Sequence, residues 1–174
     1  AVAVPADGLP IIAYLDYTAR TLKAAKCLNQ ACTGGATISV VDDPSNNLCC
    51  DVGIAVGSDG LPVIAYRDES AGSLKVARCA NASCTGAATI TTVDDPSNFV
   101  GYELSIAIGA DGLPVISHRD ITAGAVKVAK CANLACTGAS SLATVDDGPG
   151  NVGIGSSIAI GADGLPVIAF EDGG

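Results

Sequence analysis

The chain has 174 residues, a formal net charge of −9 and a pI near 4.2. This acidic balance excludes nucleic acid and anionic lipid surfaces as partners, because both are bound through an excess of Lys and Arg. No apolar run approaches the roughly 18–20 residues that a membrane-spanning helix needs.

A repeat organises the whole sequence. The string Asp-Gly-Leu-Pro begins at Asp7, Asp59, Asp111 and Asp163, so successive starts differ by 52 residues (59 − 7, 111 − 59, 163 − 111). Internal identity at a fixed step of this length is typical of repeat architectures. The sequence therefore predicts the following units: repeat 1 at 1–52, repeat 2 at 53–104, repeat 3 at 105–156 and a partial repeat 4, a first hairpin, at 157–174.

Each repeat contains four predicted strands, which lie in the third repeat at 105–108, 113–118, 125–131 and 141–145. The Asp111-Gly112 pair between the first two favours a tight hairpin turn, because both residue types tolerate a positive φ. Four short antiparallel strands in a tandem unit predict an all-β fold of β-propeller-like blades. A stacked β-solenoid is the alternative architecture.

Six of the eight cysteines form C-x4-C pairs, one in each full repeat: Cys27 and Cys32, Cys79 and Cys84, Cys131 and Cys136. Zinc needs four converging ligands, whereas each of these pairs belongs to a separate predicted blade. We therefore expect three disulfides, each stabilising an outer hairpin with few neighbours by about 2 kcal/mol. Persistent disulfides predict an oxidising, extracellular or cell-surface location.

The other two cysteines, Cys49 and Cys50, break the repeat, since Gly101-Tyr102 and Gly153-Ile154 stand at the equivalent positions. Three interpretations remain open for them: a vicinal disulfide, a cross-link between subunits, or two loop thiols oxidised to each other.

No catalytic group is predicted. His118 is the only histidine and takes the position of an aromatic residue, since Tyr14, Tyr66 and Phe170 are its equivalents. A nucleophile–base pair is therefore hard to assemble. One carboxylate ends the second predicted strand of each of the four units. We expect Arg67 and Arg119 to pair with the carboxylates that directly follow them. These carboxylates are Asp16, Asp68, Asp120 and Asp172.

Two weaker patterns concern ligands and modification. Paired aspartates at the end of each repeat are calcium candidates, but they lack the alternating ligands of an EF-hand and are also ordinary turn formers. They are Asp42 and Asp43, Asp94 and Asp95, Asp146 and Asp147. No cofactor other than calcium is expected. Asn81-Ala82-Ser83 forms a glycosylation sequon inside a cysteine hairpin.

The repeat resembles one found in secreted bacterial and archaeal proteins, of the approximate form S-L-A-x-D/G-x-x-G-x-P-x-I-S-Y-x-D followed by G-x-L-K and V-D. The residues that carry the resemblance include 105–108, 111–116, 66–68, 74–77 and 93–95. The resemblance covers the whole chain and implies an extracellular β-propeller, and it implies no particular activity.

The incomplete fourth unit suggests a function. We expect its second strand to leave an open edge that accepts another strand, and we expect copies to associate head to tail. The sequence thus predicts a self-assembling extracellular structural protein, a filament or surface-layer subunit, without catalytic activity. The alternatives are a lectin-like propeller that binds glycans through repeated sites, and a fragment of a longer cell-surface adhesin.

Overall fold

The computed structural model describes residues 1–43, 48–95, 99–149 and 151–173, apart from the Cys49 side chain. The all-β class and the four-stranded antiparallel sheets are confirmed. No helix with the length and apolar character to cross a membrane occurs in these ranges.

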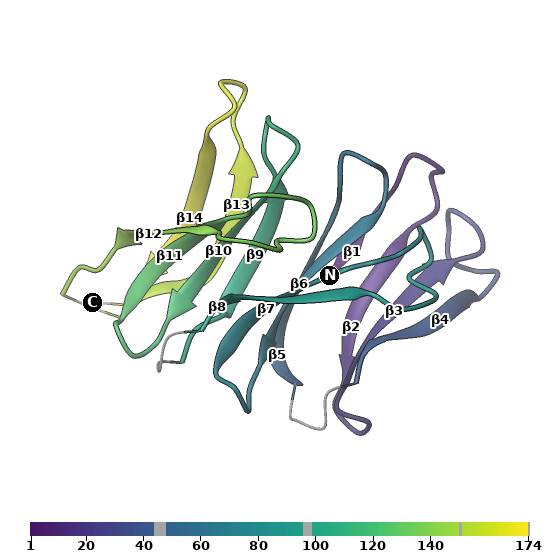
Figure 1. Cartoon of the computed structure of the whole chain (residues 1–174), viewed down its shortest axis with the longest axis horizontal. Helices are drawn as coiled ribbons and strands as arrows, with labels where there is room; N and C mark the ends of the chain where they lie inside the picture. Colours follow the sequence, from purple (N-terminus) through teal and green to yellow (C-terminus); the bar gives the residue numbers. More distant parts are fainter. Residues whose placement is uncertain (44–47, 96–98, 150, 174) are drawn as a thin grey trace.

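Three sheets and a final hairpin follow one another along the chain (Figure 1). The first sheet contains β1 (Val2–Ala3), β2 (Ile11–Asp16), β3 (Thr21–Cys27) and β4 (Ala36–Asp42). The second contains β5 (Leu48–Val56), β6 (Pro62–Asp68), β7 (Ser73–Arg78) and β8 (Thr89–Asp94). The third contains β9 (Tyr102–Ile108), β10 (Pro114–Asp120), β11 (Ala125–Lys130) and β12 (Ser141–Asp146). The final hairpin contains β13 (Val152–Ile160) and β14 (Pro166–Asp172).

Strands pair in chain order within every sheet, and the boundaries between repeats at 52/53, 104/105 and 156/157 fall inside β5, β9 and β13. The Asp-Gly turns form as the sequence predicts. In the second sheet Gly60 has a φ of 80°, which suits glycine, and Asp59 Oδ1 accepts a hydrogen bond of 3.1 Å from the Leu61 amide. All four such turns lie together along the upper edge of Figure 1.

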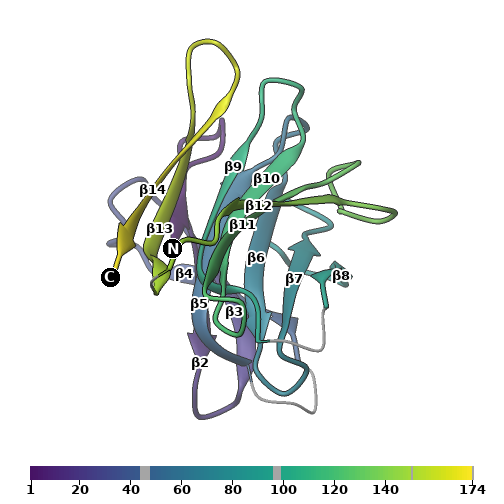
Figure 2. The same cartoon turned by 90° about the vertical axis from the view of Figure 1, so that its left-hand side faces the viewer.

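The sheets pack face to face and spread like a fan (Figures 1 and 2). The first strands of successive units, β1, β5, β9 and β13, are neighbours, whereas β4, β8 and β12 each contact mainly the third strand of their own sheet. Small Ala and Val side chains allow this close packing. One apolar core lies between the first and second sheets and another lies between the second and third.

Candidate functional site

Most of the recurring residues meet at the interfaces between successive sheets. We call each of these interfaces a joint: the first joint lies between the first and second sheets, and the second joint lies between the second and third. Each joint contains the disulfide hairpin of the later sheet. The bonds Cys27–Cys32, Cys79–Cys84 and Cys131–Cys136 are all present. Cys79 and Cys84 lie in the core between the first two sheets, and Cys131 and Cys136 lie in the next core.

The fourth strands β8 and β12 are largely exposed outer strands, as expected, but the disulfides that precede them are not exposed. Cys84 and Cys136 are each only 1% exposed, because the hairpin folds back over the preceding sheet. Cys32 of the first sheet, in contrast, is exposed. The disulfides are therefore part of the contact between sheets as well as local cross-links.

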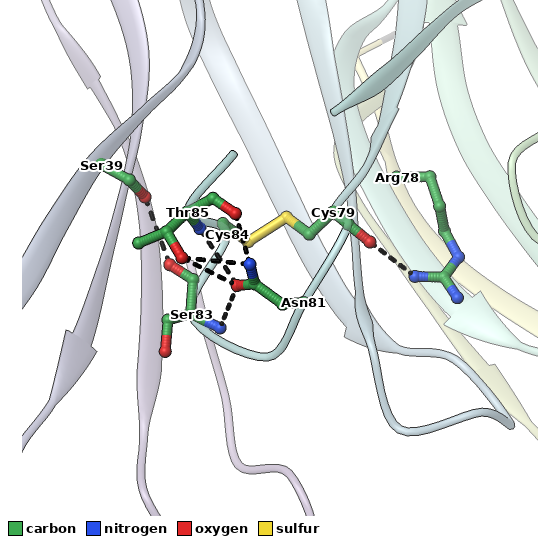
Figure 3. The surroundings of a disulfide bond; sticks show 7 residues. All are labelled: Ser39, Arg78, Cys79, Asn81, Ser83, Cys84 and Thr85. Atoms are coloured by element: carbon green, nitrogen blue, oxygen red, sulfur yellow. Dashed lines mark hydrogen bonds between the residues drawn. A yellow bond between two sulfur atoms is a disulfide. The ribbon is translucent and has the colours of Figure 1, made fainter. Parts of the chain in front are cut away.

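Hydrogen bonds fasten each hairpin to the fourth strand of the preceding sheet. Ser39 of β4 donates to the Ser83 carbonyl at 3.2 Å (Figure 3). One repeat later, Thr91 of β8 donates to the Ala135 carbonyl at 2.9 Å. The same contact therefore recurs at the same place in both joints.

The sequon residue Asn81 supports the hairpin from within (Figure 3). Its Nδ2 donates to Thr85 Oγ1 at 3.0 Å, and its Oδ1 accepts from the amides of Ser83 and Thr85. Asn133 makes the same set of bonds, to Ala135 and Thr137, although it is not in a sequon. Asn81 is therefore held in a structural role that its equivalent shares, and a glycan on Nδ2 would compete with the bond that this nitrogen donates to Thr85.

The calcium candidates Asp42 and Asp94 take part in a second contact across the joints. Tyr66 of β6 donates to Asp42 Oδ2 at 2.5 Å, which links the second sheet to the first. Lys127 of β11 donates to Asp94 Oδ2 at 3.0 Å, which links the third sheet to the second. These carboxylates are thus engaged by neighbouring sheets.

The remaining calcium candidates lie apart from such contacts. Asp146 Oδ1 accepts from the Gly148 amide at 3.0 Å, as in an ordinary turn. Asp43, Asp95 and Asp147 are exposed. In the described part of the chain, no three His, Cys, Asp or Glu side chains are arranged to hold a metal ion.

His118 is fully buried at the position that Tyr66 occupies in the second sheet. Its Nε2 lies 3.5 Å from Asp94 Oδ2, and neither ring nitrogen has a hydrogen-bond partner among the described residues. Burial lowers the pKa of His118 to about 4, against the opposing effect of Asp94. The ring is therefore neutral at physiological pH and packs as the aromatic residue that the sequence predicts.

In the three full repeats, the carboxylates at the ends of the second strands pair with lysines and not with arginines. Lys23 contacts Asp16 and Lys75 contacts Asp68, both at 2.6 Å, and Lys127 lies 3.5 Å from Asp120. The expected pairing with Arg67 and Arg119 is therefore wrong. Each lysine is paired across the two strands with the residue two positions before the aspartate, and its long side chain reaches the carboxylate.

Arg67 and Arg119 instead hold the linkers that lead to the next unit. Arg67 is fully buried, donates to the Val100 carbonyl at 3.1 Å and lies 3.8 Å from the centre of the Tyr102 ring. Arg119 bonds to Asn151 in the next linker. Sequence reasoning missed this role, because the contacts join residues more than thirty positions apart.

The first strands carry another contact that sequence reasoning missed. The Glu103 amide donates to Asp51 Oδ2 at 3.0 Å, and the Gly155 amide donates to Glu103 Oε2 at 3.1 Å. Burial raises the pKa of Asp51 above its usual range. The separation of 52 residues between partners in both bonds is the signal that could have suggested it.

Cys50 is disulfide-bonded and its backbone has a φ of 79°, which is uncommon for a residue other than glycine. The equivalent Tyr102 stands in the strand beside Arg67. The Cys49 side chain lies outside the described part of the structure, so the three interpretations of the Cys49 and Cys50 pair stay predictions.

No protein-family model matches the sequence, and no curated protein matches it significantly. Solved structures do resemble the chain. A protein of unknown function from Dyadobacter fermentans has a TM-score of 0.70 at 12% identity, over 91% of this chain and 44% of that one. A bifunctional GH43-CE protein from Bacteroides eggerthii has a TM-score of 0.61 at 11% identity, over 98% of this chain and 22% of that one.

At these identities the likeness concerns the fold alone, and the chain spans less than half the length of either protein. A fucose lectin from Kordia zhangzhouensis, solved with methyl-fucoside, has a TM-score of 0.48 at 7% identity, over 82% of this chain and 95% of the lectin. That score is too low to support an argument about fold or ligand.

Proposed function

We propose that the chain is an extracellular structural protein whose β-propeller-type sheets associate with those of other copies, and that it has no catalytic activity. The observation that carries this proposal is the repetition of one joint. The disulfide hairpin, the bond from the fourth strand to it and the aspartate contact all recur between the first and second and between the second and third sheets.

The two surfaces that pack together in such a joint each have an equivalent on an outer face, one on the first sheet and one on the final hairpin. Ile64 and Tyr66 face the first sheet in the first joint, and Ile12 and Tyr14 are their partly exposed equivalents in the first sheet. At the other end, Val167 of β14 is 61% exposed, while its equivalent Val63 is fully buried in the second joint. Two copies placed head to tail can therefore bring a first sheet against a final hairpin.

The absence of catalysis is proposed on the use made of the recurring charged groups. Asp7 with Lys26, Asp59 with Arg78 and Asp111 with Lys130 form a further set of ion pairs. Together with the lysine pairs at the strand ends and the aspartates at the joints, these contacts give the repeated carboxylates structural roles. An extracellular location is proposed because three disulfides are characteristic of oxidising compartments.

Self-association is tested by sedimentation velocity of the oxidised chain over a wide range of concentration, with negative-stain electron microscopy of the same samples. The proposal predicts oligomers, rings or filaments that grow with concentration. Tyr14→Glu places a charge on the outer face of the first sheet and should weaken association. Tyr17→Glu is the matched control, because Tyr17 lies in the adjoining turn and is 68% exposed. A monomer at every concentration would refute the proposal.

A further inference from the structure

Three serines join the third sheet to β13, and we call Ser105, Ser117 and Ser156 the serine set. Ser117 of β10 is fully buried, and its Oγ lies 3.1 Å from the Oγ of Ser156 on β13. Ser156 donates to the Glu103 carbonyl, so the proton between the two hydroxyls comes from Ser117. Ser105 of β9 accepts a hydrogen bond of 3.2 Å from the Ile158 amide. This contact is therefore held by a connected group of hydrogen bonds.

The equivalent residues in the second joint are apolar. A step of 52 residues back from the serine set leads to Gly53, Ala65 and Leu104. Ala65 and Leu104 both belong to the core between the second and third sheets. In the first joint Ala13 and Val52 stand at the places of Ala65 and Leu104, and they pack in the core between the first and second sheets. The polar residues thus replace apolar ones on both sides of a single contact.

The sizes of these residues change in a complementary way. A methyl group added at Gly53 would stand 3.1 Å from the Leu104 side chain and 3.0 Å from the Ile106 side chain, so the glycine leaves room for both. Ser105 takes the place of Gly53 in the third sheet, and the smaller Ser156 takes the place of Leu104 on the strand that packs against it. Atoms gained on one surface are therefore matched by atoms lost from the other.

An exchange of partners between the two contacts would be unfavourable in both directions. A strand with leucine at this place would crowd the side chain of Ser105 and would leave the Ser117 hydroxyl buried without a partner. A strand with serine at this place would leave a void beside Gly53 and Ala65, and its own hydroxyl would be buried unpaired. Each surface thus favours its own partner and disfavours the other, which is how selectivity arises.

Such selectivity matters in a chain of similar units, because misassembly between units and swapping of elements between chains are common errors of repeat proteins. We propose that the serine set makes the third sheet accept β13 of its own chain and reject β5 and β9 of a second copy. The serine set therefore keeps the units in order. This inference concerns contacts between neighbouring units of one chain and does not rest on the proposed function.

The first test asks whether the three residues act as one set. Ser156→Leu in the full chain should lower the urea midpoint of unfolding, because the leucine crowds Ser105 and Ser117. The triple variant Ser105→Gly, Ser117→Ala, Ser156→Leu reproduces the residues of the second joint and should restore most of the loss. Ser157→Leu is the matched control, because Ser157 is the adjacent residue of β13 and is exposed. It should change the midpoint little.

The second test measures the selection of partners directly. The unmodified chain, the triple variant and Ser157→Leu are unfolded in urea with their disulfides intact, refolded over a range of concentration and then diluted. Sedimentation velocity measures the dimer that persists after dilution. Reversible association disappears on dilution, whereas exchanged strands stay in place until the chains unfold. The triple variant, in which the two contacts are alike, should form several times more persistent dimer than the other two chains.

Two results would overturn the inference. One is a triple variant that is no more stable than Ser156→Leu, whether or not the single variant folds. The other is an equal amount of persistent dimer in the triple variant and the unmodified chain. A loss in Ser157→Leu as large as that in Ser156→Leu would also count against it, since the effect would not depend on the buried contact. Absence of reversible association would refute the proposed function and leave both tests of the serine set intact.

Discussion

At the scale of single residues, one position shows how a small chemical change is accommodated in a repeated contact. Tyr66 and His118 occupy equivalent sites in the second and third sheets, and each faces an aspartate of the preceding sheet. Tyr66 donates to Asp42 and is fully buried. Burial and the bond to Asp42 raise the pKa of Tyr66 far above its usual value, so the hydroxyl remains a donor.

Removing this hydroxyl should weaken the joint between the first two sheets. We expect Tyr66→Phe to lower the free energy of unfolding by about 1.5–3 kcal/mol, the range for hydrogen bonds to charged groups. Urea denaturation measures the loss. Tyr14→Phe is the matched control, because no described hydrogen bond involves the Tyr14 hydroxyl, and it should change stability little. An equal loss in both variants would show that the Asp42 contact is not the cause.

His118 should make stability depend on pH. Its folded pKa is about 4, below the ordinary value of 6.5, because burial disfavours the charged ring. Between these values the unfolded chain binds a proton that the folded chain does not bind, so stability rises with pH across this window. It is lost as pH falls from about 6.5 towards 4. Burial sets the lower limit of the window. Among the charged groups near the ring, Asp94 and Asp120 raise the pKa of His118 and Lys127 lowers it.

We expect His118→Tyr to flatten this part of the stability profile, because tyrosine does not titrate there and matches the residue of the second sheet. Thermal unfolding between pH 4 and pH 7, compared for the two chains, measures the effect. His118→Phe, which matches Phe170, separates the loss of titration from any new bond to Asp94. Identical slopes in all three chains would mean that other groups control the dependence.

At the scale of elements, the disulfide hairpin has two roles that depend on its place in the array. The loop closed by each bond is the same length, so the constraint on the unfolded chain is the same for all three, about 2 kcal/mol. Packing differs, because Cys84 and Cys136 are buried against a preceding sheet and Cys32 is exposed.

Removal of the second disulfide should therefore cost more than removal of the first. We expect the double variant Cys79→Ser, Cys84→Ser to lose more than the roughly 2 kcal/mol of loop constraint, because it also places two hydroxyls in an apolar core. The variant Cys27→Ser, Cys32→Ser should lose less than the first variant. Urea unfolding of both under non-reducing conditions gives the comparison. Equal losses would indicate that burial between sheets adds nothing.

At the scale of the whole molecule, net charge opposes the association that the joints favour. Each copy has a formal charge of −9, so copies repel one another at low salt. The apolar joint faces are insensitive to such screening. Association should therefore strengthen when the repulsion is screened.

We expect self-association to increase as NaCl rises from about 20 mM to about 500 mM, because the screening length shortens from tens of ångströms to a few. Sedimentation velocity at one protein concentration measures this change, with Tyr14→Glu as the reference of weakened contact. Dissociation on adding salt would show that complementary surface charges, and not apolar faces, hold the copies together.

Much of the architecture could be predicted from local signals. The step of 52 residues, the Asp-Gly turns and the alternation of small and large residues placed the strands of the third repeat close to their observed positions. The cysteine spacing identified all three disulfides, because a loop of six residues brings its ends together without help from the rest of the chain. These features depend on neighbours in sequence, so the sequence by itself determined them.

Contacts between sheets were decided only by the tertiary structure. These contacts join residues that are far apart in the chain. They include the burial of the cysteine hairpins, the bonds to Asp42 and Asp94 across the joints, and the packing of Arg67 against Tyr102. Their geometry depends on how far one sheet is rotated and shifted against the next, and neighbours in sequence within one repeat do not determine that angle.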